Sequence, residues 1–138
     1  MFDNVPNVRQ RFTKVKADQE KSSLIADEMF LAHSHAVILA LDQAIGLLDD
    51  PTKLKMKMTT LVKMHVHQNP PIGSEYFEPF ASSSHTFAMV ILGLPEDHPE
   101  VQAWVKFLYA FRNMVKAEED ALGGEAATEK ARTCCTIL

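Results

Sequence analysis

Prolines divide this sequence into segments whose apolar residues recur every three or four positions. The divisions fall at Pro51, Pro70, Pro71, Pro95 and Pro99. A spacing of three and four places apolar side chains on one face of an α-helix, whereas a half-buried strand needs alternation with a period of two. Alternation of that kind does not persist in any segment, so the sequence predicts an all-α fold.

Four helical segments follow from this spacing, together with a short helical turn that opens at Pro6. Each segment ends close to a proline or to a cluster of polar residues, as helices in globular proteins commonly do. The predicted helices cover residues 23 or 27 to 48, residues 54 to 67, residues 74 or 79 to 94, and residues 99 to about 119.

One domain over residues 1–119 and a polar tail over residues 120–138 are expected from the same pattern. The length of 138 residues lies in the range of a single domain. Beyond Glu119 the apolar spacing fades through Gly123 and Gly124. We therefore expect the chain from about Leu122 onward to lie outside the core.

Composition excludes several classes of protein. Hydrophobic residues make up 46% of the chain and charged residues 23%, which is ordinary for a globular protein and excludes a disordered one. Fourteen basic and eighteen acidic residues give a net charge of −4 without a basic stripe, so we expect no binding of nucleic acid. No apolar run approaches the roughly 18 residues of a transmembrane helix.

The expected location is cytoplasmic. Residues 1–4 are polar and acidic, whereas a secretory signal needs a basic start and an apolar run. The two cysteines, Cys134 and Cys135, are adjacent and cannot join distant parts of the fold, which fits a reducing compartment.

Two His-x-His pairs, His33 with His35 and His65 with His67, are the main candidates for chemistry. Residues two apart on a helix differ by about 200° around its axis, so each pair directs one ring inward and the other outward. The apolar spacing puts His33 and His65 on the inward faces. A single inward histidine is more often a hydrogen-bonded core residue than a ligand. Two together favour one shared ligand.

The surroundings of the two inward histidines favour haem over a bare metal ion. Zinc is the weaker alternative, because neither helix face carries the carboxylate or thiolate that would complete a four-coordinate site. Apolar walls with one histidine on either side suit a flat, largely apolar iron cofactor. One imidazole would bind the iron, and the other would face a bound gas.

The order and spacing of residues across about 1–117 resemble the globin family. The interval of 21 positions from Phe12 to His33 is similar to the globin interval between the phenylalanine after the C helix and the distal histidine. The segments that resemble parts of a globin are Phe2 to Phe12 (C helix and the phenylalanine that follows it), Ala32 to Ile45 (E helix), Leu61 and His65 (F helix), Asn69 to Ile72 with Phe77 and Phe80 (FG corner and G helix), and Ala103, Trp104, Leu108 and Phe111 (H helix).

The resemblance implies a globin-like helical fold that binds haem b. It implies His65 as the proximal ligand of the haem iron and His33 as the distal residue, with His67 a weaker candidate for the proximal position. The implied haem contacts are Phe12, His33, Val37, Leu61, His65, Ile72, Phe77 and Phe80.

The function implied by the resemblance is reversible binding of dioxygen or another diatomic gas, as a carrier, store or sensor rather than an enzyme. Two alternatives stay open. One is a haem-based redox enzyme (a dioxygenase, nitrite reductase or peroxidase), and the other is a haem-free helical interaction protein. Homo-oligomerisation is also left open.

The sequence departs from the globin pattern near its N-terminus. A complete globin has an A helix and most of a B helix before the segment that Phe2 to Phe12 resembles, and Ser34 stands where a glycine is usual. Without those helices, apolar faces of the remaining ones lack their usual cover, so we expect a marginally stable or haem-dependent fold.

The last residues carry a candidate lipidation site. Cys135 is fourth from the end and Leu138 is last, which is the pattern of a geranylgeranylation signal. Stable anchoring normally needs a second signal, which palmitoylation of Cys134 would supply. Cys135 is therefore a candidate for prenylation and for membrane association through it, and a frayed polar tail stays open as the other interpretation.

Overall fold

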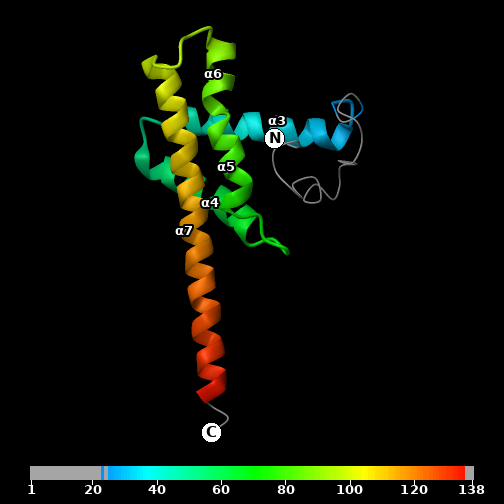
Figure 1. Ribbon diagram of the computed structural model, residues 1–138, viewed down its shortest axis with the longest axis vertical. Helices are drawn as coiled ribbons and strands as arrows, with labels where there is room; N and C mark the ends of the chain where they lie inside the picture. Colours follow the sequence, from blue (N-terminus) through cyan, green and yellow to red (C-terminus); the bar gives the residue numbers. More distant parts are fainter. Residues whose placement is uncertain (1–22, 24, 136–138) are drawn as a thin grey trace. The chain divides into compact units, whose positions relative to one another are not determined.

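The computed structural model describes residue 23 and residues 25–135, and within them the chain forms five helices and no strand (Figure 1). The all-α fold predicted from the apolar spacing is therefore confirmed. The turn predicted at Pro6 lies outside the described residues. The helices are α3 (Glu28–Ile45), α4 (Pro51–Val66), α5 (Ser74–Ser82), α6 (Ser84–Leu92) and α7 (Pro99–Cys135).

Helices α3 and α4 each begin at an aspartate that caps the first turn. The Oδ1 atom of Asp27 accepts hydrogen bonds from the backbone N–H groups of Met29 and Phe30 at 2.9 and 3.0 Å. Asp50 Oδ1 accepts one from the backbone N–H of Lys53 at 3.1 Å. The Asp50 cap places Pro51 at the first helical position, which proline favours, so α4 begins three residues before the predicted Leu54.

The chain divides into two compact units, Met1–Thr60 and Leu61–Leu138, with the boundary inside α4. In the first unit, Lys57 Nζ donates a hydrogen bond to Gln43 Oε1 at 2.6 Å and so links α4 to α3. Ala44 is buried, but α3 is apolar around most of its circumference and leaves much of that surface uncovered. Its exposed large apolar side chains are Met29, Leu31, Ile38, Leu39 and Ile45.

The single helix predicted over residues 74 or 79 to 94 is in fact two helices, which meet at Ser83. Pro79 lies inside α5 and has no N–H to donate to the preceding turn. The hydroxyl groups of Ser82 and Ser83 donate hydrogen bonds to the Pro79 carbonyl oxygen at 3.2 and 2.7 Å. Side-chain bonds of this kind compete with the helical backbone bonds, and the helix is interrupted there.

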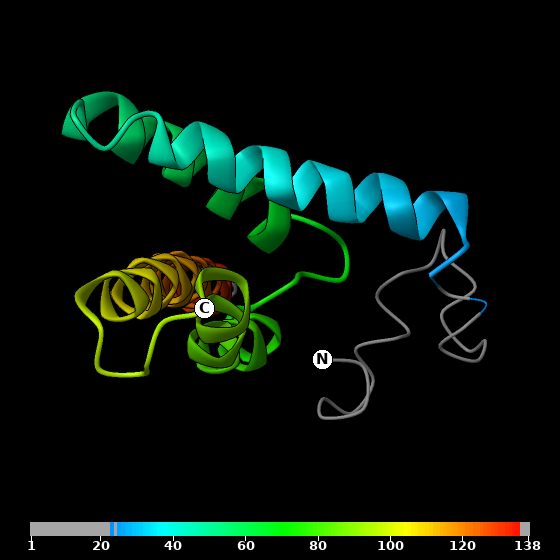
Figure 2. The same cartoon turned by 90° about the horizontal axis from the view of Figure 1, so that it is seen from above.

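Helix α7 packs along α5 and α6 in the second unit (Figure 2). Val101, Leu108 and Val115, spaced seven residues apart, are buried on one face of α7, as the apolar spacing predicts. Val62 and Val66 of α4 form a buried cluster with Val115. Half-buried side chains pack against this cluster, which is the core around the end of α4: Phe77, Phe111, Met114 and Leu122.

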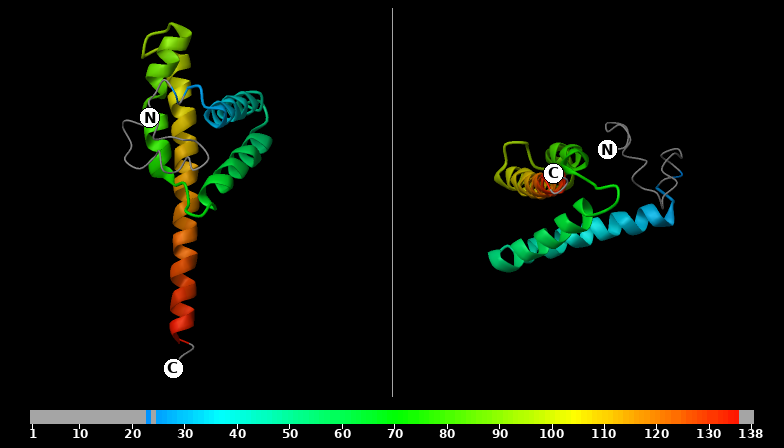
Figure 3. Two further views of the ribbon diagram at one scale, coloured as in Figure 1. Left: turned by 90° about the vertical axis from the view of Figure 1, so that its right-hand side faces the viewer. Right: turned by 90° about the horizontal axis from the view of Figure 1, so that it is seen from below.

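The predicted end of the last helix near Glu119 is wrong, because α7 continues to Cys135 (Figure 3). Alanine, glutamate, lysine and arginine dominate residues 117–132, and their helix propensity outweighs the cost of Gly123 and Gly124. Leu122 packs against the buried cluster, so the core also extends past the boundary that the fading pattern indicated. In the part of the chain that the structure describes, no helix combines the length and the apolar run needed to cross a membrane.

Candidate functional site

His65 lies in the last turn of α4, half-buried, with its ring held by a backbone hydrogen bond. Its Nδ1 atom lies 2.7 Å from the carbonyl oxygen of Leu61, one turn earlier. A carbonyl oxygen can only accept, so Nδ1 is the donor, and in the neutral ring Nε2 then keeps its lone pair. This is the tautomer in which a histidine binds a metal through Nε2, with Nδ1 oriented by a backbone acceptor.

Besides the hydrogen bond to Leu61, an aromatic contact also holds the His65 ring in place. The ring of Phe77 on α5 meets it edge-on, with centroids 5.1 Å apart and an interplanar angle of 84°. Phe77 in turn meets Phe111 of α7 edge-on at 5.3 Å and 88°. Because both phenyl rings also pack on the core cluster around Val66, the imidazole stands against a fixed apolar wall.

Five of the residues predicted to contact haem lie in the second unit. Leu61 and His65 are joined by the hydrogen bond within α4, and the backbone N–H of Ile72 donates to the His65 carbonyl oxygen at 3.1 Å. Phe77 contacts the His65 ring, and Phe80 lies three residues further along α5. Leu61, Ile72, Phe77 and Phe80 are all half-buried, and the phenyl ring of Phe77 packs on the imidazole of His65.

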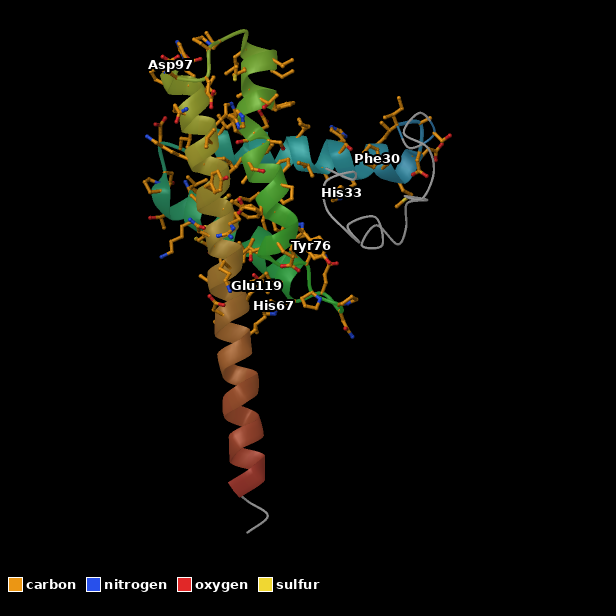
Figure 4. The ribbon with its side chains drawn as sticks, viewed as in Figure 1. Phe30, His33, His67, Tyr76, Asp97 and Glu119 are labelled. Atoms are coloured by element: carbon orange, nitrogen blue, oxygen red, sulfur yellow. The ribbon has the colours of Figure 1, made fainter. Side chains whose placement is uncertain are left out.

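His33 and Val37 lie in the first unit, four residues apart on one face of α3 (Figure 4). His33 is exposed and Val37 is half-buried. Phe12, the remaining predicted contact, lies outside the described residues. His33 and Val37 therefore stay predictions as the distal residue and its apolar neighbour.

The inward and outward directions predicted for the two histidine pairs are found in only one of them. His65 is half-buried whereas His67 is exposed, as the helical angle predicts. On α3 the prediction is wrong for burial, because His33 and His35 are both exposed. The helical angle separates the directions of two rings, but it does not by itself determine which of them is buried.

The donor set of this site fits haem. Porphyrin supplies four nitrogen ligands of its own, so the protein needs to provide only an imidazole with a free lone pair and apolar surroundings. His65 Nε2 and the side chains around it meet both conditions. No group of three or more His, Cys, Asp or Glu side chains able to hold a metal ion occurs among the described residues.

Sequence reasoning missed two carboxylates that lie close to this site. Glu118 of α7 hydrogen-bonds to His67, and Glu119 hydrogen-bonds to the backbone N–H of Ser74, at the two ends of the connector between α4 and α5. Figure 4 labels His67 and Glu119. These contacts join residues 45 and 51 positions apart, which no local spacing indicates. Gly73 was the available signal, since a glycine beside a helix start often marks a close approach of another group.

The candidate lipidation site, Cys135, is the last residue of α7. The backbone of α7 is described up to Cys135, and residues 136–138 lie outside the described part. Prenylation of Cys135 stays a prediction.

Two comparisons with known proteins give matches along most of the chain. The sequence model of the family described as Globin matches residues 1–115. A protein of Biomphalaria glabrata named "Globin" is 34% identical over 116 residues, which cover 84% of this chain and 76% of the relative. No solved structure matches the chain.

Proposed function

Because this chain belongs to the globin family, we propose that it binds haem b through His65 and binds dioxygen or another diatomic gas reversibly. The observation that carries the proposal is the 2.7 Å contact of His65 Nδ1 with the Leu61 carbonyl oxygen, which leaves Nε2 as the atom able to bind iron. Haem, when bound, supplies the iron at which a diatomic gas binds.

The protein's part on the proximal side is to hold one imidazole in one tautomer and one orientation. The Leu61 carbonyl holds the Nδ1 proton and raises the basicity of Nε2. Phe77 limits the rotation of the ring. Leu61, Ile72, Phe77 and Phe80 provide apolar surface that excludes water from the cofactor.

His33 is proposed as the distal residue. It occupies the position in α3 that resembles the distal histidine of globins, and Val37 lies one turn later on the same face. An imidazole N–H at that position donates a hydrogen bond to a polar bound gas, an interaction of about 1.5–3 kcal/mol when the acceptor carries charge. Dioxygen accepts such a bond far better than carbon monoxide, so His33 discriminates between the two gases.

The test measures the rates for two gases in the haem-loaded protein with His33→Leu. Dioxygen should dissociate at least about tenfold faster, because 1.4 kcal/mol corresponds to a factor of ten, while carbon monoxide binding changes less. His35→Leu is the matched control, since His35 is exposed two positions along the same helix. Equal responses of both gases, or an equal effect of His35→Leu, would refute the distal role of His33.

The same preparation separates the alternative functions. Sustained turnover with a reductant, in place of reversible oxygenation, would indicate a haem-based redox enzyme that uses the same residues. A protein that fails to take up haem would indicate the haem-free interaction protein.

A further inference from the structure

Two adjacent carboxylates of α7 hold the two ends of the connector between α4 and α5. At one end, His67 Nε2 donates a hydrogen bond to Glu118 Oε1 at 2.9 Å. At the other end, the backbone N–H of Ser74 donates one to Glu119 Oε2 at 3.0 Å. An ionised carboxylate can accept hydrogen bonds but cannot donate them. The glutamates are therefore the acceptors at both ends of the connector. The connector 67–73 is therefore tied to α7 where it leaves α4 and where it enters α5.

Gly73 makes room for the second of these carboxylates. A Cβ atom at Gly73 would overlap Glu119 Oε1 and would lie 2.8 Å from Glu119 Cδ, and it would also crowd Glu75 Oε2 of the first turn of α5. The backbone of Gly73, with φ −92° and ψ −176°, is extended and open to any residue. The missing side chain thus serves close approach of the carboxylate, not an unusual backbone conformation.

The environment of Ser74 makes the Glu119 contact specific. Ser74 is only 7% exposed, so its N–H would lose an acceptor in a largely water-free position if the carboxylate were removed. Ser74 is also the first residue of α5, where the helix dipole favours a negative charge.

The connector contacts the backbone of His65, and α5, which follows it, contacts the His65 ring. The N–H of Ile72 donates to the carbonyl oxygen of His65 at 3.1 Å. Phe77, in the first turn of α5 after Ser74, stands edge-on to the imidazole at 5.1 Å. A shift of the connector or of the start of α5 would therefore be transmitted to His65 by two separate contacts.

From these contacts we infer that Glu118 and Glu119 are positioning residues for His65, acting through the connector 67–73. The two carboxylates with His67 and Ser74 form what we call the α7 clamp. The clamp sets where Ile72 and Phe77 lie, and these set the direction of the His65 ring towards the iron. The inference rests on the proposed function, in which His65 is the iron ligand.

The experiment uses three clamp variants and one control. Glu118→Ala and Glu119→Ala remove one carboxylate each, and Gly73→Ala places a methyl group where the Glu119 carboxylate lies. Asp120→Ala is the matched control, because it removes the next carboxylate of α7, which pairs with Lys116 of the same helix at 2.6 Å. Glu119→Gln keeps an acceptor oxygen and should preserve the clamp.

The first measurement is the iron–histidine stretching band of the haem-loaded ferrous protein, read by resonance Raman spectroscopy. The band should shift or broaden in all three clamp variants and should keep its position in Glu119→Gln and Asp120→Ala. Glu118 contacts an exposed histidine, so Glu118→Ala should fold normally. Its band can therefore be measured even if Glu119→Ala does not fold.

The second measurement is amide hydrogen exchange over residues 67–74 in the haem-free chain, where no cofactor supports the connector. Exchange there should become about tenfold faster in the clamp variants, because a hydrogen bond that ties the connector to α7 is lost. Exchange in α6 should stay unchanged.

Three results would overturn the inference. A band that stays in place in the clamp variants, whatever the exchange rates, would show that the clamp does not position His65. An equal shift in Asp120→Ala would show a general effect of charge. A wild-type protein without any iron–histidine band would refute the proposed function and the inference with it, whereas a band that is present but insensitive refutes the inference alone.

Discussion

Phe77 stands edge-on to His65, with ring centroids 5.1 Å apart and an interplanar angle of 84°. The same phenyl ring meets Phe111 at 5.3 Å, so one side chain of α5 links the end of α4 to α7. Perpendicular aromatic pairs contribute about 0.5–1.5 kcal/mol each beyond the area they bury. The orientation of the candidate iron ligand therefore depends on the packing of a different helix.

Replacement of Phe77 by leucine should lower the free energy of unfolding by about 1–3 kcal/mol, because both ring contacts are lost and space is left beside the core cluster. Urea unfolding of the wild type and the variant measures this difference. Phe87→Leu is the control, since Phe87 is 55% exposed on α6 and should change the free energy by less than about 0.5 kcal/mol. Equal losses in the two variants would refute the proposed packing role of Phe77.

Leu122→Ala should lower the free energy of unfolding by about 1–2 kcal/mol. The loss is smaller than for the same substitution at a fully buried leucine, because Leu122 is half-buried against the core cluster. Val90→Ala on α6 should have little effect, since Val90 is 75% exposed. The same urea experiment serves for both. No difference between them would mean that the core ends before Leu122, as the sequence pattern alone indicated.

Asp50 should make stability depend on pH in the acid range. The hydrogen bond from the Lys53 side chain is the largest cause that lowers the pKa of Asp50 in the folded state. The hydrogen bond from the Lys53 backbone N–H lowers the pKa further. A lowered folded-state pKa stabilises the protein above the unfolded-state pKa, and that contribution is lost as the pH falls towards the folded-state value. The melting temperature of the wild type should therefore fall more steeply than that of Asp50→Asn below the usual aspartate pKa. Parallel curves, or an equal effect of Asp49→Asn, would contradict this.

Haem should raise the melting temperature of the chain, because a ligand that binds only the folded state stabilises it by mass action. The haem-free chain should also associate, since α6 leaves Phe87, Val90 and Ile91 between 55% and 75% exposed. Near-ultraviolet circular dichroism at several protein concentrations measures both effects. A sharp, concentration-independent transition in the haem-free monomer would contradict the expected dependence on haem.

The local features of the fold could be predicted from the sequence because they depend on neighbours in the chain. The start of α7 at Pro99 and its buried face through Val101, Leu108 and Val115 follow from proline preference and from helical spacing. The opposite exposure of His65 and His67 agrees with the helical angle, which directs two rings that are two positions apart to different faces.

Other features could not be predicted because they depend on competing or distant interactions. The break at Ser83 arises because serine hydroxyl groups donate hydrogen bonds to the Pro79 carbonyl oxygen. The spacing of apolar residues does not indicate these bonds. The contacts of Glu118 and Glu119 with the connector require the packing of α7 against the end of α4 and the start of α5. Tertiary arrangement, not local preference, creates that part of the site.

The measurement that tests the central claim most directly is the spectrum of the haem-loaded His65→Gly variant, with and without added imidazole. If His65 Nε2 binds the iron, the variant should lose the iron–histidine band and the absorption spectrum of the ligated haem, and free imidazole should restore both. His67→Gly should keep the iron–histidine band without imidazole, shifted only as in Glu118→Ala, because His67 is bonded to Glu118 and is not the proposed iron ligand. A wild-type spectrum in His65→Gly without imidazole would contradict the account.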